Sequence, residues 1–170
     1  MPRIGGNQPN AQRDPTDLYP TPEHWTEALL SQVKLRGPVW ECAAGNHDMV
    51  RVLCRHGYQV NATDILAGTD FLAQDQPWAG SIVTNPPYSL ASQFVDKALE
   101  LAAEQTAMLL PVGALGGQRR YRQLWSQRPP SLVLIIATRM PMNGQASQFN
   151  HCWVVWDRRY KRPTSLRWAL

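Results

Sequence analysis

Residues 81–112 read SIVTNPPYSLASQFVDKALELAAEQTAMLLPV. The run SIVT at the start of this stretch is short and apolar, which predicts a buried strand. Apolar residues at helical spacing then predict a helix from Leu90 to Glu104, and the run TAMLLPV predicts a second strand. Strands separated by a helix are typical of a parallel sheet. This stretch therefore predicts an α/β fold.

The same alternation continues on both sides of this stretch. Upstream, strands are predicted at VWEC (39–42) and QVNATD (59–64), with a helix from about Asp48 to His56 and a short run, GTDFL, at 68–72. Downstream, a helix is predicted over Gln118 to Ser126, a buried strand at 131–137, and a last strand from His151 to Trp156 that closes a hairpin. We expect a single-domain, Rossmann-like α/β sandwich, with a mostly parallel sheet, helices on both faces and an antiparallel last strand.

The first 18 residues differ in composition from the rest of the chain. They are rich in Gly, Pro, Asn, Gln and Asp and lack a hydrophobic period, which predicts a flexible arm at 1–18 ahead of one domain at 19–170. Thr21, Pro22 and Glu23 then predict a helix start, with an N-cap, a proline in the first turn and an acid near the positive end of the dipole. The apolar face of that helix is formed by Trp25, Leu29, Leu30 and Val33.

The composition is that of one globular domain, and its charge is unevenly distributed. The chain has 170 residues, of which 44% are hydrophobic, and a formal net charge of +4. Residues 1–115 carry 7 Lys or Arg and 12 Asp or Glu, whereas residues 116–170 carry 10 Lys or Arg and 1 Asp or Glu. Nine of those ten cations are Arg and are interleaved with aromatic residues, which favours binding to a polyanion. The alternative is a solvated basic face.

The remaining composition argues against disulfides, metals and membranes. Three cysteines without a CxxC pair indicate a reducing compartment, and the histidines lack the spacing of metal ligands, so no metal is expected. The longest apolar run, 132–137, is far shorter than the ~20 residues of a membrane helix. We therefore expect a cytoplasmic protein that neither spans a membrane nor is exported.

The loop Asn85-Pro86-Pro87-Tyr88 follows the strand 81–84 directly. Two prolines remove two N–H donors and leave carbonyl acceptors on a rigid loop. This arrangement suits a planar NH2 group, because the Asn85 side-chain oxygen and the Pro86 carbonyl can accept its two hydrogens while Tyr88 stacks on the attached π system. Adenine N6, cytosine N4 and a glutamine amide fit almost equally. The alternative is a simple turn with a tyrosine that only packs.

With this loop, the chain resembles the class I S-adenosylmethionine-dependent methyltransferases that modify planar nitrogens. Tyr19-Pro20-Thr21-Pro22 looks like their cofactor-covering motif, and Glu41-Cys-Ala-Ala-Gly45 looks like their glycine loop. Asp64 looks like their ribose-binding acid, and Asp70-Phe71 resembles the motif that contacts the adenine ring of the cofactor. The resemblance implies a methyltransferase sandwich, S-adenosyl-L-methionine as cofactor, and catalytic roles for Asn85, Pro86, Pro87 and Tyr88. It also implies cofactor contacts from Tyr19, Thr21, Pro22, Glu41, Ala43, Gly45, Asp64, Ile65, Asp70, Phe71 and Asn85.

The chain departs from this family at the glycine loop. The family usually has a second glycine two residues after Gly45, where this chain has His47. A side chain there could crowd the approach of the cofactor to the backbone. Between a cofactor contact and a residue at the start of the following helix, we favour the helix position for His47.

The order of GTDFL, NPPY, a group of Arg and aromatic residues, and a final W-x-x-W-D is similar to that of small phage-type DNA adenine methyltransferases. The resemblance implies methyl transfer to adenine N6 in DNA. Few residues follow the predicted last strand, so we expect target recognition to come from loops, from a homodimer or from a specificity partner. The loop candidates are Arg119, Arg120, Arg122 and Arg139. Alternatives are an N4-cytosine or RNA amino-methyltransferase, a protein glutamine N5-methyltransferase, and a non-catalytic nucleic-acid-binding module.

Overall fold

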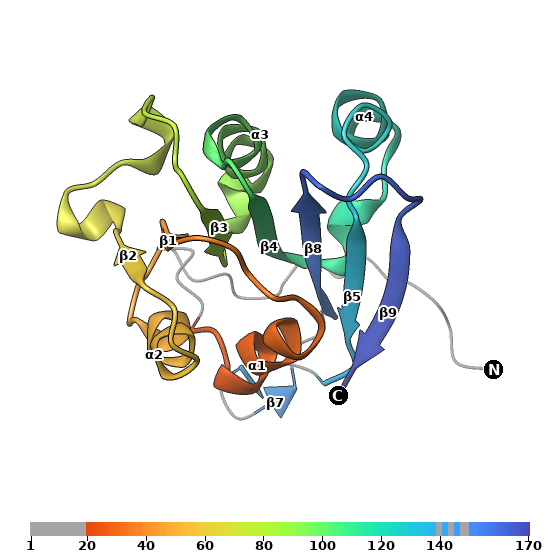
Figure 1. The fold of residues 1–170 in the computed structure, drawn as a ribbon. Coiled ribbons are helices and arrows are strands. Elements are labelled where there is room, and N and C mark those ends of the chain that lie inside the picture. Colours follow the sequence, from red (N-terminus) through yellow and green to blue (C-terminus); the bar gives the residue numbers. More distant parts are fainter. Residues whose placement is uncertain (1–19, 139–140, 143–144, 147–149) are drawn as a thin grey trace.

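A computed structural model describes residues 20–138, 141–142, 145–146 and 150–170 (Figure 1). The expected arm at 1–18, together with Tyr19 and Arg139, lies outside the described residues.

The described chain forms a seven-stranded sheet with the order β2-β1-β3-β4-β8-β5-β9. Its strands are β1 (Val39–Glu41), β2 (Val60–Ala62), β3 (Ser81–Thr84), β4 (Gln105–Pro111), β5 (Leu132–Ile136), β8 (His151–Asp157) and β9 (Ser165–Ala169). The strand β8 runs antiparallel to its neighbours β4 and β5, and every other pairing in this sheet is parallel. Two further short strands, β6 (Pro141–Met142) and β7 (Gln145–Ala146), pair with each other. The prediction of a mostly parallel sheet is confirmed.

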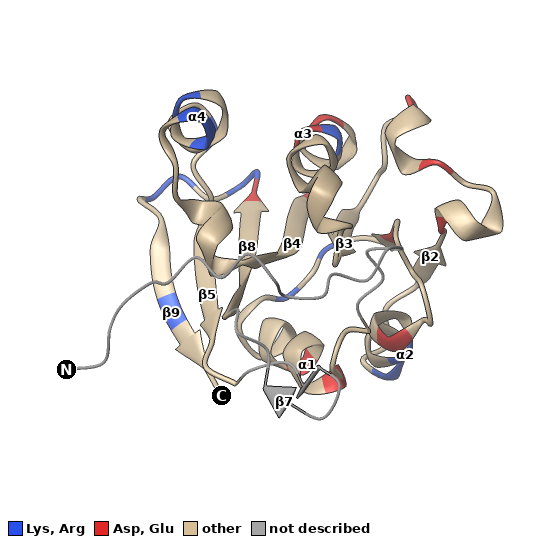
Figure 2. Cartoon of the chain, turned by 180° about the vertical axis from the view of Figure 1, so that it is seen from behind, with Lys and Arg blue, Asp and Glu red and all other residues tan. Residues whose placement is uncertain are grey.

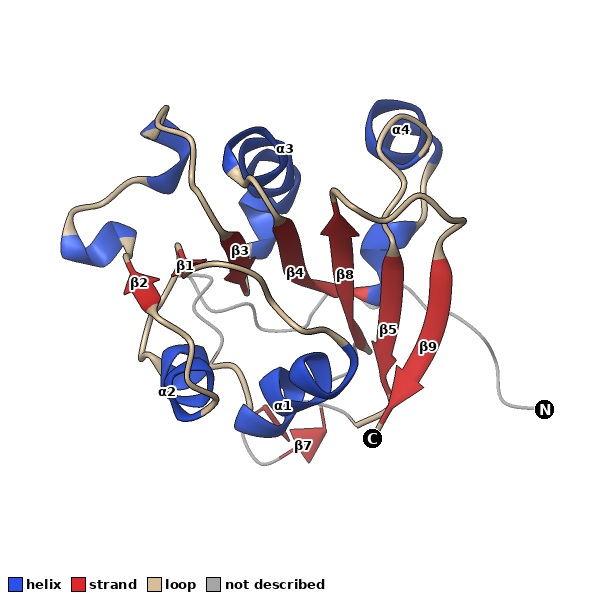
Figure 3. Cartoon of the chain, viewed as in Figure 1, coloured by secondary structure: helices blue, strands red, loops and turns tan. Residues whose placement is uncertain are grey.

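Helices cover both faces of the sheet (Figure 3). One face is covered by α1 (Glu23–Gln32) and α2 (Asp48–Arg55), and the other by α3 (Ala91–Leu101) and α4 (Gln118–Arg120), which continues as the π-helical turn η5 (Tyr121–Trp125). Short 3-10 helices complete the connections: η1 (Ile65–Ala67), η2 (Phe71–Ala73), η3 (Tyr88–Leu90) and η4 (Val112–Leu115). The expected Rossmann-like sandwich is therefore the observed architecture.

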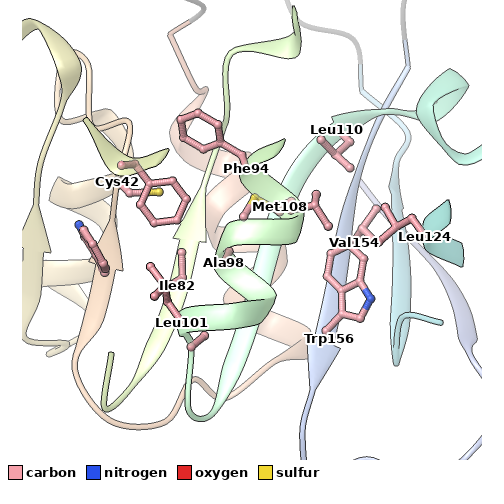
Figure 4. Packing of buried hydrophobic residues seen from close by; sticks show 14 of the residues in the cluster. Cys42, Ile82, Phe94, Ala98, Leu101, Met108, Leu110, Leu124, Val154 and Trp156 are labelled. Carbon is pink, nitrogen blue, oxygen red and sulfur yellow. The ribbon is translucent and has the colours of Figure 1, made fainter. Parts of the chain in front are cut away.

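The two helical layers produce two hydrophobic cores. Trp25 and Leu29 lie four residues apart on α1 and are fully buried against one face of the sheet. On the other face, Phe94, Ala98 and Leu101 of α3 pack against the strands (Figure 4). Because both faces are covered, all four residues of β3 are buried, including the polar Ser81 and Thr84 at its ends.

Several predicted element boundaries were wrong. The strand ending at Trp156 is not the last, because β9 follows it and pairs in parallel with β5. Thr21 is not the N-cap of α1; Pro22 occupies that position and makes no side-chain capping bond. That helix ends at Gln32, so Val33, which was expected on its apolar face, is the C-cap. The run GTDFL leads into the 3-10 helix η2.

Candidate active site

A cavity of about 290 Å³ opens at the carboxyl ends of β1, β2 and β3. From β1 the chain passes first to β2 on one side and later to β3 on the other, so the strand order reverses at β1. Ligands bind at such reversals in open α/β sheets. Nine residues of the predicted cofactor set line the cavity: Thr21, Glu41, Ala43, Gly45, Asp64, Ile65, Asp70, Phe71 and Asn85.

Glu41 ends β1 and lies in the cavity wall, where only 1% of it is exposed. Its Oε1 accepts hydrogen bonds from the Ala43 backbone N–H, at 3.0 Å, and from the Thr84 hydroxyl. Burial raises the pKa of Glu41 to about 7, and the nearby negative charge of Asp64 acts in the same direction. A cationic group bound in the cavity would favour the ionised carboxylate.

Asp64 follows β2 and connects the strand end to the glycine loop. Its Oδ2 accepts from the Gly45 N–H at 2.9 Å, and its Oδ1 accepts from the Leu66 N–H at 2.8 Å. The neighbouring Ala44 N–H donates to the Thr63 carbonyl at 3.0 Å. A carboxylate has about four acceptor positions, so Asp64 can hold this loop and still accept from hydroxyl groups of a ligand.

His47 occupies the N-cap position of α2, with a left-handed backbone at φ 62°. The prediction that it belongs to the start of a helix is confirmed. Both Gly45, at φ 46°, and Asn46 line the cavity, whereas His47 does not. The His47 side chain therefore does not narrow the cavity.

The opposite wall of the cavity is largely apolar. Phe71 is buried, with its ring 5.2 Å from Trp40 and 5.0 Å from Phe94 between centroids. Asp70 caps η2 by accepting from the Leu72 N–H at 2.9 Å. Ile65 is 65% exposed although it lines the cavity, so it offers an uncovered apolar surface to a planar ligand.

The loop after β3 brings Asn85 to the cavity. The Asn85 Nδ2 donates to the Thr21 hydroxyl at 3.1 Å, which directs the amide nitrogen toward Thr21 and leaves Oδ1 as the acceptor of that amide. Pro87 lines the cavity, while Pro86 is buried and does not line it. Thr21 thus acts as a partner of the catalytic candidate and not as a helix cap.

Tyr88 is half-buried and belongs to a column of three rings. Its ring centroid lies 5.7 Å from that of His151 at the start of β8, and the His151 ring lies 4.9 Å from that of Trp25 on α1. The Trp25 Nε1 donates to the Thr138 hydroxyl at 3.0 Å, which fixes the far end of the column. No role beside Tyr88 was predicted for His151, because the two residues are distant in sequence.

The arginines predicted to bind substrate lie outside the cavity. Arg119 and Arg122 are exposed on α4 and η5. Arg120 is also exposed, but its guanidinium donates to the carbonyls of Gly116, at 2.8 Å, and Gly113, at 3.1 Å. Arg120 therefore supports the preceding loop, while Arg119 and Arg122 face solvent.

The cavity wall also contains residues that the sequence analysis did not select. Leu90 and Phe94 lie four residues apart around the start of α3, and Met49 comes from α2. Helical spacing was the available signal for Leu90 and Phe94, but it does not distinguish a cavity wall from a core. Among the described residues, no group of three His, Cys, Asp or Glu could hold a metal ion. No helix in the described part of the chain is long and apolar enough to cross a membrane.

Solved structures share this architecture at low sequence identity. A protein from Listeria monocytogenes, provisionally assigned as a class I S-adenosylmethionine-dependent methyltransferase, matches 96% of this chain and 67% of its own, with TM-score 0.57 and 14% identity. The fold is that of class I methyltransferases. No protein-family model and no curated protein sequence matches the chain.

Two further structures extend the comparison of the methyltransferase fold. The methyltransferase subunit of a type I restriction-modification system from Streptococcus thermophilus matches 86% of this chain, with TM-score 0.60 and 14% identity. This chain covers 45% of that subunit, so it spans less than half of its length. A provisionally assigned RNA methyltransferase from Pyrococcus horikoshii matches 79% of this chain and 80% of its own, with TM-score 0.52 and 13% identity.

Proposed function

We propose that this chain transfers a methyl group from S-adenosyl-L-methionine to the N6 amino group of adenine in DNA. The observation that carries the proposal is the position of Asn85, whose amide is oriented by Thr21 at the wall of a cavity that also holds Glu41 and Asp64. This position supports a role for the Asn85 amide oxygen as an acceptor for an NH2 group, and the two carboxylates suit a cationic, hydroxyl-bearing ligand.

The donor set of the cavity fits the cofactor. The Glu41 carboxylate can pair with its ammonium group, Asp64 can accept from its ribose hydroxyls, and the apolar surfaces of Ile65 and Phe71 suit its adenine ring. The cavity volume, about 290 Å³, is at the lower end of the range for small-molecule sites. When bound, the cofactor would supply an electrophilic methyl group.

The chain's own residues would activate and position the accepting nitrogen. The lone pair of an exocyclic amine is delocalised into the ring, which makes the nitrogen a poor nucleophile. Hydrogen bonds from its two hydrogens to the Asn85 Oδ1 and the Pro86 carbonyl draw them out of the ring plane and return electron density to nitrogen. Tyr88, supported by His151, would stack on the base. Such positioning can supply up to ~7–11 kcal/mol, so no strong base is required.

The choice of adenine in DNA rests on the resemblance of the motif order and on charge. The region after residue 115 carries 10 Lys or Arg against 1 acid, which favours a nucleic acid over a free small molecule. A Streptococcus neighbour belongs to a restriction-modification system, and a Pyrococcus neighbour is assigned to RNA methylation. RNA is therefore the second candidate substrate. We expect recognition of a particular sequence to come from loops, a homodimer or a specificity partner.

Product analysis tests the proposal. The protein is incubated with methyl-labelled cofactor and a mixture of DNA and RNA, and the products are digested to nucleosides. We expect the label to elute with N6-methyldeoxyadenosine. Label in N4-methyldeoxycytidine would show that the target base is cytosine and not adenine. Label in a ribonucleoside would show that the substrate is RNA and not DNA. Absence of both transfer and cofactor binding would favour a non-catalytic module.

The substitution Asn85→Ala tests the role of the amide. Removing one positioned hydrogen-bond partner of a reacting group typically costs about 10²–10³-fold in rate. We expect a loss of methyl transfer of that size, measured as kcat with labelled cofactor, while calorimetry shows retained cofactor binding. Asn61→Ala is the matched control, because Asn61 is exposed on β2 and does not line the cavity. Full activity of Asn85→Ala would rule out the proposed role.

A further inference from the structure

A second cavity, of about 550 Å³, lies at the end of the sheet where the parallel strands begin. We call this end the amino edge, and the end that holds the candidate active site the carboxyl edge. The second cavity is bordered by the first residues of β4, the end of β8, the chain after η5, and the connection from β8 to β9. We call it the amino-edge groove. The seven residues of β4 separate the two edges by roughly 23 Å at ~3.3 Å per residue. The groove is therefore distinct from the cofactor cavity.

The acidic residues at the amino-edge groove already have cationic partners. Glu104 pairs with Arg36 at 2.8 Å and with Arg159 at 2.7 Å. Asp157 accepts from both terminal nitrogens of Arg36. The hydrogen bond to Arg36 holds the pKa of Glu104 below its ordinary value, so this carboxylate is ionised at neutral pH. Neither acid is left to neutralise further cations in the groove.

Additional positive charge lines the groove. Arg158 donates to the carbonyls of Ala102, at 2.7 Å, and Leu99, at 2.8 Å, so its charge is bound to neutral acceptors. Lys161 and Arg162 are exposed in the groove and form no ion pair with any described acid. Three positive charges therefore remain uncompensated at this edge, and an anion would bind there favourably.

The connection that carries these cations is held in place. The Tyr160 hydroxyl donates to the Pro163 carbonyl at 3.0 Å, and the Thr164 hydroxyl donates to the Pro130 carbonyl at 2.6 Å. The Arg158 backbone N–H donates to the Glu104 carbonyl at 3.1 Å. A loop fixed in this way loses little freedom on binding, which favours affinity for an extended ligand.

We infer that the amino-edge groove binds the phosphodiester backbone of the nucleic acid that flanks the target base. This inference rests on the proposed function. The segment from α4 through η5 runs from the carboxyl edge, after β4, to the amino edge, before β5, and carries the exposed Arg119 and Arg122. Figure 2 shows basic residues on α4 and on the β8–β9 connection. These cations define a path by which one nucleic acid can reach from the cofactor cavity to the groove.

A nucleic acid fits this arrangement better than an acidic protein segment. The cations extend from α4 to the β8–β9 connection, and a polymer with one phosphate every ~3.4 Å per strand can contact cations on both elements. Contacts of this kind position the nucleic acid without reading its sequence. The groove would therefore increase affinity for long substrates and leave base recognition to the residues near Asn85.

The dependence of binding on duplex length tests this inference. A 10-bp duplex centred on the target base extends only about 17 Å to each side, less than the distance between the sheet edges, whereas a 30-bp duplex extends about 51 Å. We compare fluorescein-labelled duplexes of both lengths by anisotropy at several salt concentrations. The test variant is K161A/R162A. The control is R55Q/R167Q, which removes the same charge near α1, where Arg55 contacts Glu23 and Arg167 contacts Gln32.

For the 30-bp duplex, we expect K161A/R162A to weaken binding by on the order of tenfold and to reduce the salt slope by about two. The 10-bp duplex should bind the wild-type protein and this variant alike, and the control should change neither slope. Equal loss for both lengths, or no loss for the longer duplex, would overturn the inference. If the groove binds an acidic peptide and not DNA, K161A/R162A should bind the 30-bp duplex as well as the wild-type protein does. Because the readout is binding, the inference can be judged even if no methyl transfer is found.

Discussion

Glu41 is almost completely enclosed, and its burial raises its pKa to about 7. A raised pKa means that the folded protein favours the protonated acid, so this group lowers stability as pH rises from the ordinary value of 4.5 toward 7. Binding an ammonium group requires the ionised form. Cofactor affinity should therefore increase with pH across this range.

Calorimetric titration with S-adenosyl-L-methionine between pH 6 and pH 8 measures this effect. We expect affinity to fall by about tenfold from pH 8 to pH 6, as the ionised fraction of a group with pKa near 7 does. Glu41→Gln keeps an acceptor for the Ala43 N–H and removes the charge, so it should bind weakly and lose this pH dependence. Any titration that remains in the variant belongs to the ligand. Identical profiles for both proteins would contradict the role of Glu41.

Individual residues were predictable where their role follows from local position. Asp64 could be selected because it ends the predicted strand 59–64, and Asp70 because Asp70-Phe71 resembles the adenine motif of the methyltransferases. Both line the cavity. The contact between Thr21 and Asn85 joins residues 64 positions apart, and no local signal distinguishes it from a helix cap. His47 shows the reverse case, since its place at the start of α2 was predictable while its left-handed backbone was not.

At the scale of elements, the column of Trp25, His151 and Tyr88 links α1, β8 and η3 behind the candidate catalytic loop. His151→Leu removes the middle ring and keeps a similar volume. An aromatic contact contributes about 0.5–1.5 kcal/mol, so we expect a loss of about two- to twelvefold in kcat/KM for methyl transfer. His151→Phe should restore most of it, because a ring again supports Tyr88.

A readout specific to Tyr88 separates positioning from general destabilisation. A duplex with 2-aminopurine at the target position reports the unstacking and restacking of the base through its fluorescence. We expect His151→Leu to change this signal while the affinity for the cofactor stays the same. If Leu and Phe variants behave identically in both measurements, the ring at position 151 does not support Tyr88.

The elements themselves were predictable to different extents. Helices and buried strands have apolar periods, and β1 to β5 and β8 were found from them. The edge strand β9 was missed because it is short and has no buried apolar run, with Leu166, Arg167 and Trp168 all exposed. The predicted helix over 118–126 is observed as a short α-helix that widens into a π-helical turn, a change that hydrophobic spacing does not encode.

At the scale of the whole molecule, the uneven charge of the sequence becomes a spatial division. The candidate cofactor cavity takes its acids from the first part of the chain, whereas Figure 2 shows basic residues on α4 and on the β8–β9 connection. The sequence predicted a basic region but not its division between two edges of the sheet. That division depends on β8 and β9 running in opposite directions, which places residues 158–162 at the other end of the strands from the candidate catalytic loop.

The exposed pair Arg119 and Arg122 lies between these two edges and should contact phosphates beside the target base. R119A/R122A should weaken binding to duplex DNA and lower the salt slope by about one to two, because each lost phosphate contact releases one counterion fewer. Unlike K161A/R162A, it should affect 10-bp and 30-bp duplexes alike, since these residues are closer to the active site. Cofactor affinity, measured by calorimetry, should not change. A salt slope equal to that of the wild type would remove α4 from the interface and leave the amino-edge groove without a continuous path to the catalytic loop.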